Sequence, residues 1–313
     1  MGAEAIPARE LGTGGLQVSE IGLGCNNFGG RLDQEATTQV VDAALEAGIT
    51  LFDTADIYGG QGGSEQQLGV ALKGRRDAVV LATKFGMDME GANGDDSAGR
   101  GHPDYVRRAC EASLRRLGTD HIELFQYHEP DGRTPLADTL GAMQALVDEG
   151  KVGAIGISNV NAAEIEESAA VTRIASVQNE YNLLNRDLED EVLPACERLG
   201  IGILPYFPLA SGRLSGKYLR GREAPAGTRL HGREVATDQQ FDQLEELAAF
   251  AQSREISMVT VAIGALLAQP VVSSVIAGAT RPVQVVQNVA AAAWRPTAAD
   301  LAEIDTITPP PVR

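Results

Sequence analysis

The chain is poor in cysteine, in aromatic residues and in positive charge. Only three of its 313 residues are cysteines (Cys25, Cys110 and Cys196), and 4% are aromatic. Three scattered cysteines exclude a disulfide framework and a zinc knuckle, so we expect a reducing compartment. Asp and Glu number 43 against 26 Lys and Arg, a formal net charge of -17. Because nucleic-acid surfaces need clustered Lys and Arg, we expect no nucleic-acid partner.

Long apolar segments are also missing. The longest, "MVTVAIGALLA" at 258–268, is about half the length that crosses a bilayer. The start, "MGAEAIPARE", lacks an apolar signal core, and Ile6 stands where a myristoylation signal needs Ser or Thr. We therefore expect a soluble, cytoplasmic protein that does not associate with membranes.

Short apolar runs alternate with amphipathic segments along the whole chain, which is typical of βα units and a parallel sheet. The runs cover residues 20–25, 49–54, 78–85, 122–128, 152–158, 175–181, 201–207 and 273–280. Eight repeats predict a closed (β/α)8 TIM barrel. No low-complexity linker divides the chain, so we expect one domain over residues 1–313.

A hairpin and two long loops complete the predicted barrel. The stretch "ARELGTGGLQVS" predicts an N-terminal β-hairpin cap at the bottom of the barrel, with Gly14 and Gly15 as its turn. Long loops from Gly86 to His102 and from Pro208 to Glu234 follow the third and seventh strands. Both should therefore lie on the carboxyl rim, where a barrel carries its active site.

Cap residues predict the limits of two helices. Asp33 is the expected N-cap of the first, and Gly48 its C-cap. In the second, Thr134 is the expected cap, Pro135 the first helical residue and Gly150 the stop.

Most of the predicted strands end in a polar or reactive side chain. These residues are Asp53, Lys84, His128, Ser158 with Asn159, Gln178, Tyr206 and Thr280. In a closed barrel the strand ends converge on one mouth, so they predict a single active site there. In "LFDTADIYGG", Tyr58 follows the strand-end Asp53 by five residues and is expected at the same mouth.

A Rossmann domain is the competing interpretation, because "GLGCNNFGG" follows the first strand and precedes a helix. Gly22 and Gly24 fit its fingerprint, but Asn27 stands where the third glycine belongs. Asp53 comes 31 positions after Gly22 (53 minus 22), where roughly 20 are expected. The spacing therefore disfavours a Rossmann fold.

Seven segments resemble the aldo-keto reductase superfamily, in order and over nearly the whole chain. They are "GITLFDTADIYGGQGGSEQQLG", "LATKFG", "LRRLGTDHIELFQYHEPD", "GKVGAIGISN", "VQNEYN", "PLASGRLSGKY" and "VIAGATRPVQVVQN". The resemblance implies a (β/α)8 barrel that binds NADPH (NADP+) without a Rossmann domain. It also implies an NADP-dependent oxidoreductase that reduces aldehydes and ketones.

The resemblance assigns a catalytic tetrad to Asp53, Tyr58, Lys84 and His128, with Tyr58 as the general acid. A free phenol has a pKa of about 10, and a neighbouring ammonium such as Lys84 lowers it. Asp53 would keep that ammonium charged, and His128 would donate a hydrogen bond to the carbonyl oxygen. The other histidines, His102, His121 and His231, show no ligand spacing with His128, so we expect no metal.

The family's cofactor contacts also carry over by resemblance. Ser158, Asn159 and Gln178 would bind the carboxamide of the nicotinamide, and Tyr206 would stack on its ring. Asp53 would also lie there, and Cys25 is expected near the nicotinamide because it closes the first strand. The pyrophosphate would lie against Pro208, Leu209, Ser211 and Lys217. The adenosine half would contact Gly278, Thr280, Arg281, Gln284, Gln287 and Asn288.

Individual residues qualify this assignment. Arg281 favours NADPH over NADH, because its guanidinium can pair with a 2'-phosphate. Gln287 replaces a common Glu, and Phe207 replaces the small polar residue that usually follows Tyr206 and is expected to change the pocket floor. Cys25 is expected to fill the rim as a small side chain rather than act as a reactive thiol.

Two other functions and the substrate stay open. One alternative is an NADPH-binding regulatory or redox-sensing module that resembles potassium-channel β subunits; the other is a phosphosugar isomerase on the same barrel. The complete tetrad favours an enzyme with a small-molecule carbonyl substrate. The arginine-rich segment 212–234 would either favour an anionic substrate or clamp the cofactor phosphates. We expect a monomer or a weak homo-oligomer.

Overall fold

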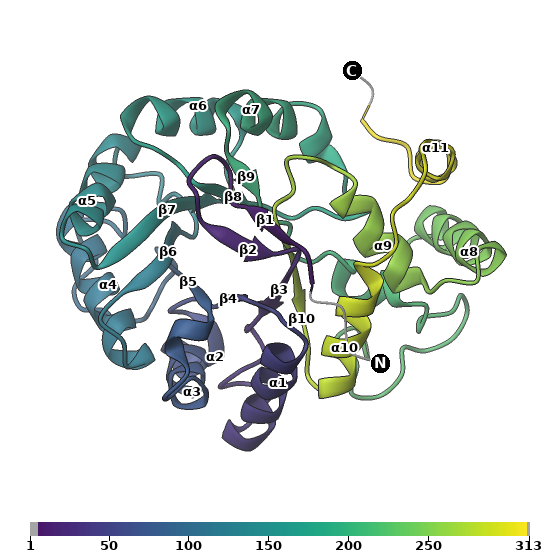
Figure 1. Ribbon diagram of the computed structural model, residues 1–313, viewed down its shortest axis with the longest axis horizontal. Coiled ribbons are helices and arrows are strands. Elements are labelled where there is room, and N and C mark those ends of the chain that lie inside the picture. Colours follow the sequence, from purple (N-terminus) through teal and green to yellow (C-terminus); the bar gives the residue numbers. More distant parts are fainter. Residues whose placement is uncertain (1–5, 312–313) are drawn as a thin grey trace.

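The computed structural model describes residues 6–311, and its centre is an eight-stranded parallel sheet curled into a barrel (Figure 1). The strand order is β10-β3-β4-β5-β6-β7-β8-β9. Backbone hydrogen bonds link each edge strand to the chain beside the other: Ile203 N donates to Val271 O (2.8 Å), just before β10, and Ile276 N donates to Pro205 O (3.0 Å), just after β9. These strands are β3 (Ile21–Gly24), β4 (Leu51–Asp53), β5 (Val80–Phe85), β6 (Ile122–Tyr127), β7 (Val152–Ser158), β8 (Ser176–Gln178), β9 (Gly202–Ile203) and β10 (Val275–Gly278). The (β/α)8 prediction is confirmed.

Helices surround the sheet (Figure 1). Those that follow the eight strands in turn are α1 (Gln34–Glu46), α3 (Gly63–Ala71), α4 (Pro103–Leu117), α5 (Leu136–Asp148), α6 (Ala162–Val171), α7 (Val192–Leu199), α9 (Met258–Leu267) and α10 (Pro282–Ala291). A short α2 (Tyr58–Gln61) precedes α3. Two further helices, α8 (Asp238–Ser253) and α11 (Ala298–Ile307), pack beside α9 outside the ring and share a second apolar core.

The predicted N-terminal hairpin is confirmed. Strands β1 (Ala8–Glu10) and β2 (Gln17–Ser19) pair antiparallel across one end of the barrel (Figure 1). Its loop spans residues 11–16 and is closed by the bond from Leu11 N to Leu16 O, so the turn is longer than the predicted glycine pair. The fully buried Leu11 packs with Leu51 and Leu124 inside the barrel. The hairpin therefore plugs this end of the core.

The predicted limits of α1 are nearly correct. The Asp33 carboxylate caps α1 by accepting from Ala36 N at 2.9 Å. Ala47 is the C-cap, and Gly48 follows it with a φ of 82°. The prediction of Gly48 as the cap is therefore wrong by one residue, because glycine occupies the left-handed position beyond the cap.

The predicted start of α5 is also displaced by one residue. Pro135 is the N-cap and not the first helical residue. Thr134 precedes this cap, no side chain caps the helix, and the Thr134 hydroxyl donates to Asp131 at 3.0 Å. Gly150, with a φ of 73°, follows the C-cap Glu149 as the expected stop.

Alternation along the strands explains where the polar side chains gather. Leu51 and Leu124 belong to the apolar cluster inside the barrel. Two residues further along their strands, Asp53 and Gln126 are hydrogen-bonded to each other. Because side chains two apart on a strand share a face, each strand contributes an apolar layer near the hairpin and a polar layer at its carboxyl end.

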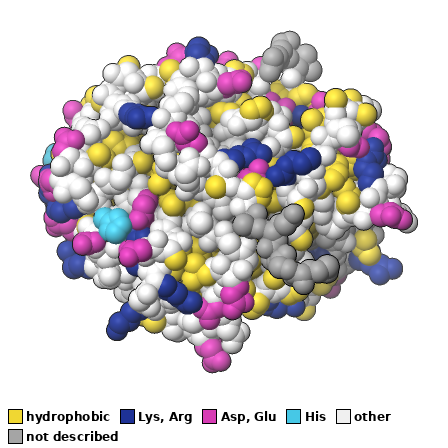
Figure 2. Space-filling model, in the orientation of Figure 1, with side chains coloured by type: hydrophobic (Ala, Val, Ile, Leu, Met, Phe, Trp, Pro, Cys, Tyr) yellow, Lys and Arg dark blue, Asp and Glu magenta, His cyan; other side chains and the backbone are white. Residues whose placement is uncertain are grey.

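On the face that carries the hairpin, Lys and Arg side chains are dispersed among Asp and Glu (Figure 2). None of the helices between residues 6 and 311 has the length and apolar composition of a membrane span. The single-domain prediction for residues 1–313 stays a prediction, and its ends, residues 1–5 and 312–313, lie outside the described residues.

Candidate active site

A pocket of about 1040 Å³ opens at the carboxyl ends of the strands. Its lining includes every residue predicted to contact the cofactor: Cys25, Asp53, Ser158, Asn159, Gln178, Tyr206, Pro208, Leu209, Ser211, Lys217, Gly278, Thr280, Arg281, Gln284, Gln287 and Asn288. Tyr58 and His128 line it as well, while Lys84 lies behind them, fully buried. The pocket has the size of a cofactor site.

Asp53, Lys84 and Tyr58 form a chain of contacts at the pocket floor. The Lys84 ammonium donates to Asp53 Oδ2 at 2.7 Å, to Thr54 O at 2.9 Å and to Tyr58 Oη at 3.4 Å. Burial alone would lower the pKa of Lys84, but the Asp53 carboxylate and the Tyr58 phenol together outweigh it, and the pKa lies above its ordinary value. Lys84 is therefore charged, as predicted from the sequence.

The pKa of Tyr58 differs from the prediction. Burial of the phenol raises this pKa above 10.0 and outweighs the opposing effect of Lys84. The Lys84 ammonium has the predicted effect, but the predicted net lowering of the Tyr58 pKa is wrong. Loss of solvent disfavours the phenolate more than the ammonium favours it. Tyr58 thus holds its proton at neutral pH and can give it up to a base.

His128 lies directly after β6 and faces Tyr58. The two rings meet edge to face, with centroids 5.7 Å apart and planes at 86°. Burial, with a further contribution from Lys84, lowers the pKa of His128 to about 3. At neutral pH the imidazole is therefore uncharged and carries one N–H that it can donate. Its Nδ1 atom is buried without a hydrogen-bond partner among the described residues.

Two glutamines hold the far side of the Asp53 carboxylate. Gln126 Nε2 and Gln178 Nε2 donate to Asp53 Oδ1 at 3.1 and 2.9 Å. Gln178 also donates to Gln126 Oε1 at 3.1 Å. The sequence reasoning missed Gln126, although a buried glutamine two residues before His128 falls on the inward face of β6. These donors fix the orientation of the carboxylate, whose other oxygen faces Lys84.

The residues predicted to hold the carboxamide also form hydrogen bonds to one another. Tyr206 Oη donates to Asn159 Oδ1 at 2.8 Å, and Asn159 Nδ2 donates to His128 O at 2.9 Å. Ser158 Oγ donates to the main-chain oxygen of Gln178 at 2.6 Å. Asn159 has a left-handed backbone, with a φ of 57°, which aims this cluster at the pocket.

Cys25 follows β3 directly and is fully buried. Its N–H donates to Asp53 O at 2.9 Å. Burial raises the pKa of the thiol well above its ordinary value, so the reactive thiolate is disfavoured. This agrees with the prediction of a space-filling residue.

The opposite end of the pocket is formed by the start of α10. Arg281 is the N-cap, Pro282 is in the first turn and Thr280 precedes the cap. Gln284 folds back to accept from Thr280 N at 2.8 Å and from Thr280 Oγ at 3.1 Å. Arg281 therefore lies at a helix N-terminus, where anions are favoured.

Several lining residues were not named from the sequence, although some of them lie within the segments quoted above. They are Gly24, Asn26, Asn27 and Arg31 after β3, Gly212, Ser215, Ala226, Gly227, Thr228 and Arg229 in the long loop, Ser257, Val259 and Thr260 near α9, Ile276, Ala277 and Ala279 in or after β10, and Ala290 in α10. Asn27 Oδ1 is buried and has no partner among the described residues. Four cations line the pocket, and Asp53 is the only acidic residue among the described lining residues. This polarity fits a cofactor that carries phosphates.

A buried polar network lies behind Tyr58. Asp56 Oδ2 accepts from Asn93 at 2.8 Å, and Asn93 accepts from Arg116 at 3.0 Å. Arg116 also donates to the buried Glu65 at 2.6 Å. Burial, with repulsion from Glu65, raises the pKa of Asp56 to about 7. Because Asp56 N donates to Lys84 O at 3.0 Å, the network links the Tyr58 segment to β5.

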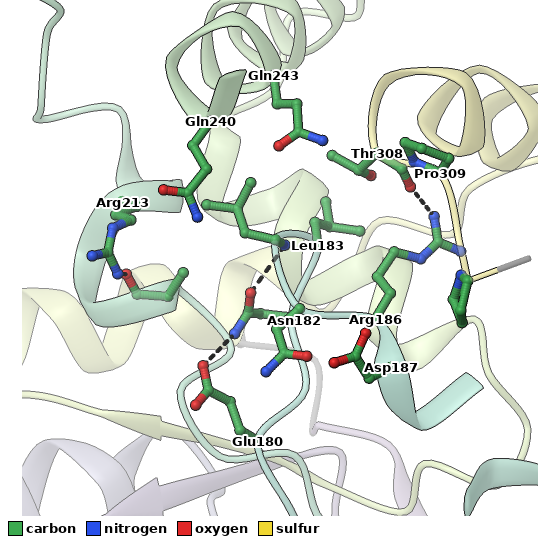
Figure 3. A pocket seen from close by; sticks show the side chains of 14 residues that line it. Glu180, Asn182, Leu183, Arg186, Asp187, Arg213, Gln240, Gln243, Thr308 and Pro309 are labelled. Atoms are coloured by element: carbon green, nitrogen blue, oxygen red, sulfur yellow. Dashed lines mark hydrogen bonds between the residues drawn. The ribbon is translucent and has the colours of Figure 1, made fainter. Parts of the chain in front are cut away.

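A smaller pocket of about 450 Å³ lies between α8 and the segment after α11. Its two arginines already have partners. Arg186 bonds the carbonyl of Thr308 (Figure 3) and also Asp305, while Arg213 bonds backbone carbonyls. Asn182 also has partners: its Nδ2 donates to Glu180 at 3.3 Å, and its Oδ1 accepts from Leu184 N at 3.0 Å (Figure 3). The larger pocket differs, because the side chains of Lys217, Arg229 and Arg281 make no hydrogen bond or ion pair among the described residues. No group of three or more described His, Cys, Asp or Glu side chains is arranged to hold a metal ion.

Comparisons with known proteins agree with this geometry. The model of the aldo/keto reductase family matches residues 20–309. A protein called probable aldo-keto reductase 1, from Glycine max, is 35% identical over 308 residues, which covers 96% of this chain and 88% of that protein. The holo structure of aldo-keto reductase AKR11C1 from Bacillus halodurans is similar with a TM-score of 0.83, 33% identity and 98% coverage of both chains. The chain therefore belongs to the aldo-keto reductase family of oxidoreductases.

Proposed function

We propose that this protein reduces aldehydes or ketones to alcohols with NADPH, and that Tyr58 is the general acid. The observation that carries the proposal is the buried ammonium of Lys84, which joins the Asp53 carboxylate at 2.7 Å to the Tyr58 phenol at 3.4 Å. This chain of contacts ends at the floor of a pocket large enough for a dinucleotide. A small-molecule carbonyl substrate would enter beside Tyr58 and His128.

NADPH supplies a hydride when it is bound. Tyr206 offers an aromatic face for the nicotinamide ring, and Ser158, Asn159 and Gln178 lie beside it for the carboxamide. Lys217 and the segment 208–211 would hold the pyrophosphate. Residues 278–288 would hold the adenosine half at the N-terminus of α10.

The protein residues provide orientation and a proton. Neutral His128 donates its N–H to the carbonyl oxygen and polarises it. Tyr58 transfers its proton to the same oxygen as negative charge develops there. Lys84 stabilises the phenolate that remains, and Asp53 keeps Lys84 charged within the buried site. Because the pKa of Tyr58 is raised, the acid form persists across the neutral range, and reduction should fall only at alkaline pH.

Arg281 supports NADPH rather than NADH. It is the N-cap of α10, lines the pocket and has no carboxylate partner among the described residues. A guanidinium there can bind the 2'-phosphate of NADPH in a bidentate manner.

The test follows reduced-nicotinamide absorbance with a panel of short, aromatic and sugar aldehydes, using either NADPH or NADH. We expect turnover with NADPH and a KM for NADPH that rises about tenfold or more in Arg281→Gln, with little change for NADH. Arg222→Gln, an exposed position on the long loop, serves as the control and should leave both KM values unchanged. Tight NADPH binding without turnover of any carbonyl would contradict the proposed activity.

A further inference from the structure

The long loop between β5 and α4, residues 86–102, joins the two segments that carry Tyr58 and His128. None of the described side chains of this loop lines the large pocket. The loop is attached at two points. Asn93 bonds the segment that leads into Tyr58, and Gly101 bonds the turn that follows His128. The proposed mechanism leaves this loop without a role.

The first attachment is buried and lies two residues before Tyr58. Asn93 is 5% exposed, and its Nδ2 donates to Oδ2 of the fully buried Asp56 at 2.8 Å. Its Oδ1 accepts from Arg116 at 3.0 Å, so both polar atoms of the amide have partners. Arg116 also donates to Glu65 on α3 at 2.6 Å. The loop, α3 and α4 therefore converge on the start of the Tyr58 segment.

The second attachment lies three residues after His128. One oxygen of Asp131 accepts the N–H of Gly101 at 2.8 Å, and the other accepts the N–H of Thr134 at 2.8 Å. Burial opposes ionisation of Asp131, but such backbone donors outweigh it and lower the pKa to about 2. The Asp131 N–H donates to the hydroxyl of Tyr127, the residue before His128, at 2.8 Å. A carboxylate that is charged at neutral pH thus ties this turn to the loop.

The two attachments enclose the pair of side chains that must meet one carbonyl oxygen. The rings of Tyr58 and His128 lie edge to face, with centroids 5.7 Å apart. Gly59 and Gly60 follow Tyr58 with φ values of 72° and 73°, so the local backbone alone constrains the phenol little. A displacement of about 1 Å at a reacting group can cost about a hundredfold in rate. The Tyr58 segment therefore needs support from outside itself.

We propose that the loop 86–102 braces Tyr58 against His128, and that Asn93 is a positioning residue for the reaction. Asn93 acts through Asp56, because it touches neither the pocket nor the two rings. The proposal rests on the proposed reductase function. It assigns the buried network behind Tyr58 to the alignment of the proton donor.

The first test replaces Asn93 and measures kcat separately from NADPH binding. In Asn93→Ala we expect kcat to fall about tenfold or more, while the affinity and stoichiometry of NADPH stay unchanged. Thr172→Ala is the matched control, because it removes a 2.6 Å side-chain bond to Gln144 outside the pocket lining, and it should keep its kcat. A kcat within about twofold of the wild type in Asn93→Ala, or a loss matched by fewer NADPH sites, would overturn the proposal.

Exchanging the two polar groups tests the contact itself. At pH 8, Asn93→Asp alone puts two carboxylates face to face and should lower kcat. Asp56→Asn in the same chain again pairs an amide with a carboxylate, leaves Arg116 an acceptor and should recover most of kcat. Glu65, Arg116 and Tyr105 are the other titratable groups that interact with Asp56, and both variants keep them. Because the exchanged pair still fills the network, this test holds even if Asn93→Ala does not fold, and no recovery would overturn the proposal.

Hydrogen exchange separates the brace from the activity, because it needs no turnover. Amides of residues 54–62 should exchange faster in Asn93→Ala than in the wild type, while those of the N-terminal hairpin should not. This outcome supports the brace even if no carbonyl is reduced. Unchanged exchange over residues 54–62 would overturn it.

Discussion

Replacing Asp53 with Asn should leave the Lys84 ammonium buried beside a neutral amide. In the wild type the Lys84 side chain is fully buried, and the 2.7 Å contact with Asp53 is its only ion pair among the described residues. The amide keeps the size of the carboxylate and can still bond Gln126 and Gln178. The substitution therefore removes charge while disturbing packing little.

The expected cost follows from this burial. Breaking a buried ion pair by removing one partner destabilises a protein by about 3–5 kcal/mol, since the remaining charge is uncompensated. That is a large part of a typical stability of about 5–15 kcal/mol. The double variant Asp53→Asn, Lys84→Met removes both charges and should cost less than the sum of the single variants, by about 2 kcal/mol or more. Lys84→Met alone should cost less than Asp53→Asn, because two glutamines still donate to the carboxylate.

Urea unfolding at pH 7 and pH 9.5, followed by two spectroscopic probes, measures these free energies. Without Asp53, burial should lower the pKa of Lys84 below its unfolded value. The destabilisation should then be greatest at pH 7 and shrink as the pH rises through the lowered pKa. A loss under about 1 kcal/mol in Asp53→Asn, or strict additivity in the double variant, would refute the reasoning.

Three further predictions concern neighbouring residues. Asp56→Asn should raise the free energy of unfolding at pH 8 more than at pH 5. The pKa of Asp56 is raised to about 7 in the folded state, so the wild-type protein loses stability as the pH rises to that value, and the neutral amide does not. A lower free energy of unfolding for the variant at pH 8 would contradict this. Gly59→Ala should lower both Tm and kcat, because its Cβ would lie 2.4 Å from Phe28 O. Gly60→Ala, at a similar positive φ but with open space around its Cβ, should affect them less, and equal effects would argue against the clash. Cys25 should resist a thiol reagent in the native protein at pH 7 and react after unfolding, and rapid native labelling found by mass spectrometry would disagree.

The fold was predictable because its signals are local and repeated. Eight β-branched runs separated by amphipathic segments indicate one architecture, and period-two alternation then decides which side chains face inward. The errors at the helix ends were of one residue, at Gly48 and Pro135, where cap geometry depends on the exact backbone angles. Helices α8 and α11 lie outside the βα repeat. The repeat therefore could not predict that they pack together in a second apolar core.

The site was predictable only where a motif carried it. Strand-end residues such as Asp53 and Lys84 were found because the barrel brings all strand ends together. Gln126 was missed because a single glutamine in an apolar run has no meaning until its partner, Asp53, is known to lie opposite. Arg31 and Arg229 are about two hundred residues apart in sequence, and only the folded loop brings them to one pocket. Likewise the net pKa of Tyr58 depends on how deeply it is buried, which the sequence does not contain.

The role of Tyr58 as the proton donor is the central claim, and Tyr58→Phe tests it most directly. NADPH affinity is measured by nucleotide fluorescence, and turnover by absorbance, with Tyr105→Phe as a control: a buried tyrosine of α4 outside the pocket lining. We predict that Tyr58→Phe binds NADPH as the wild type does, while kcat falls by about 10²-fold or more. Tyr105→Phe should keep its turnover. A Tyr58→Phe protein that binds NADPH and reduces aldehydes at the wild-type rate would contradict the mechanism.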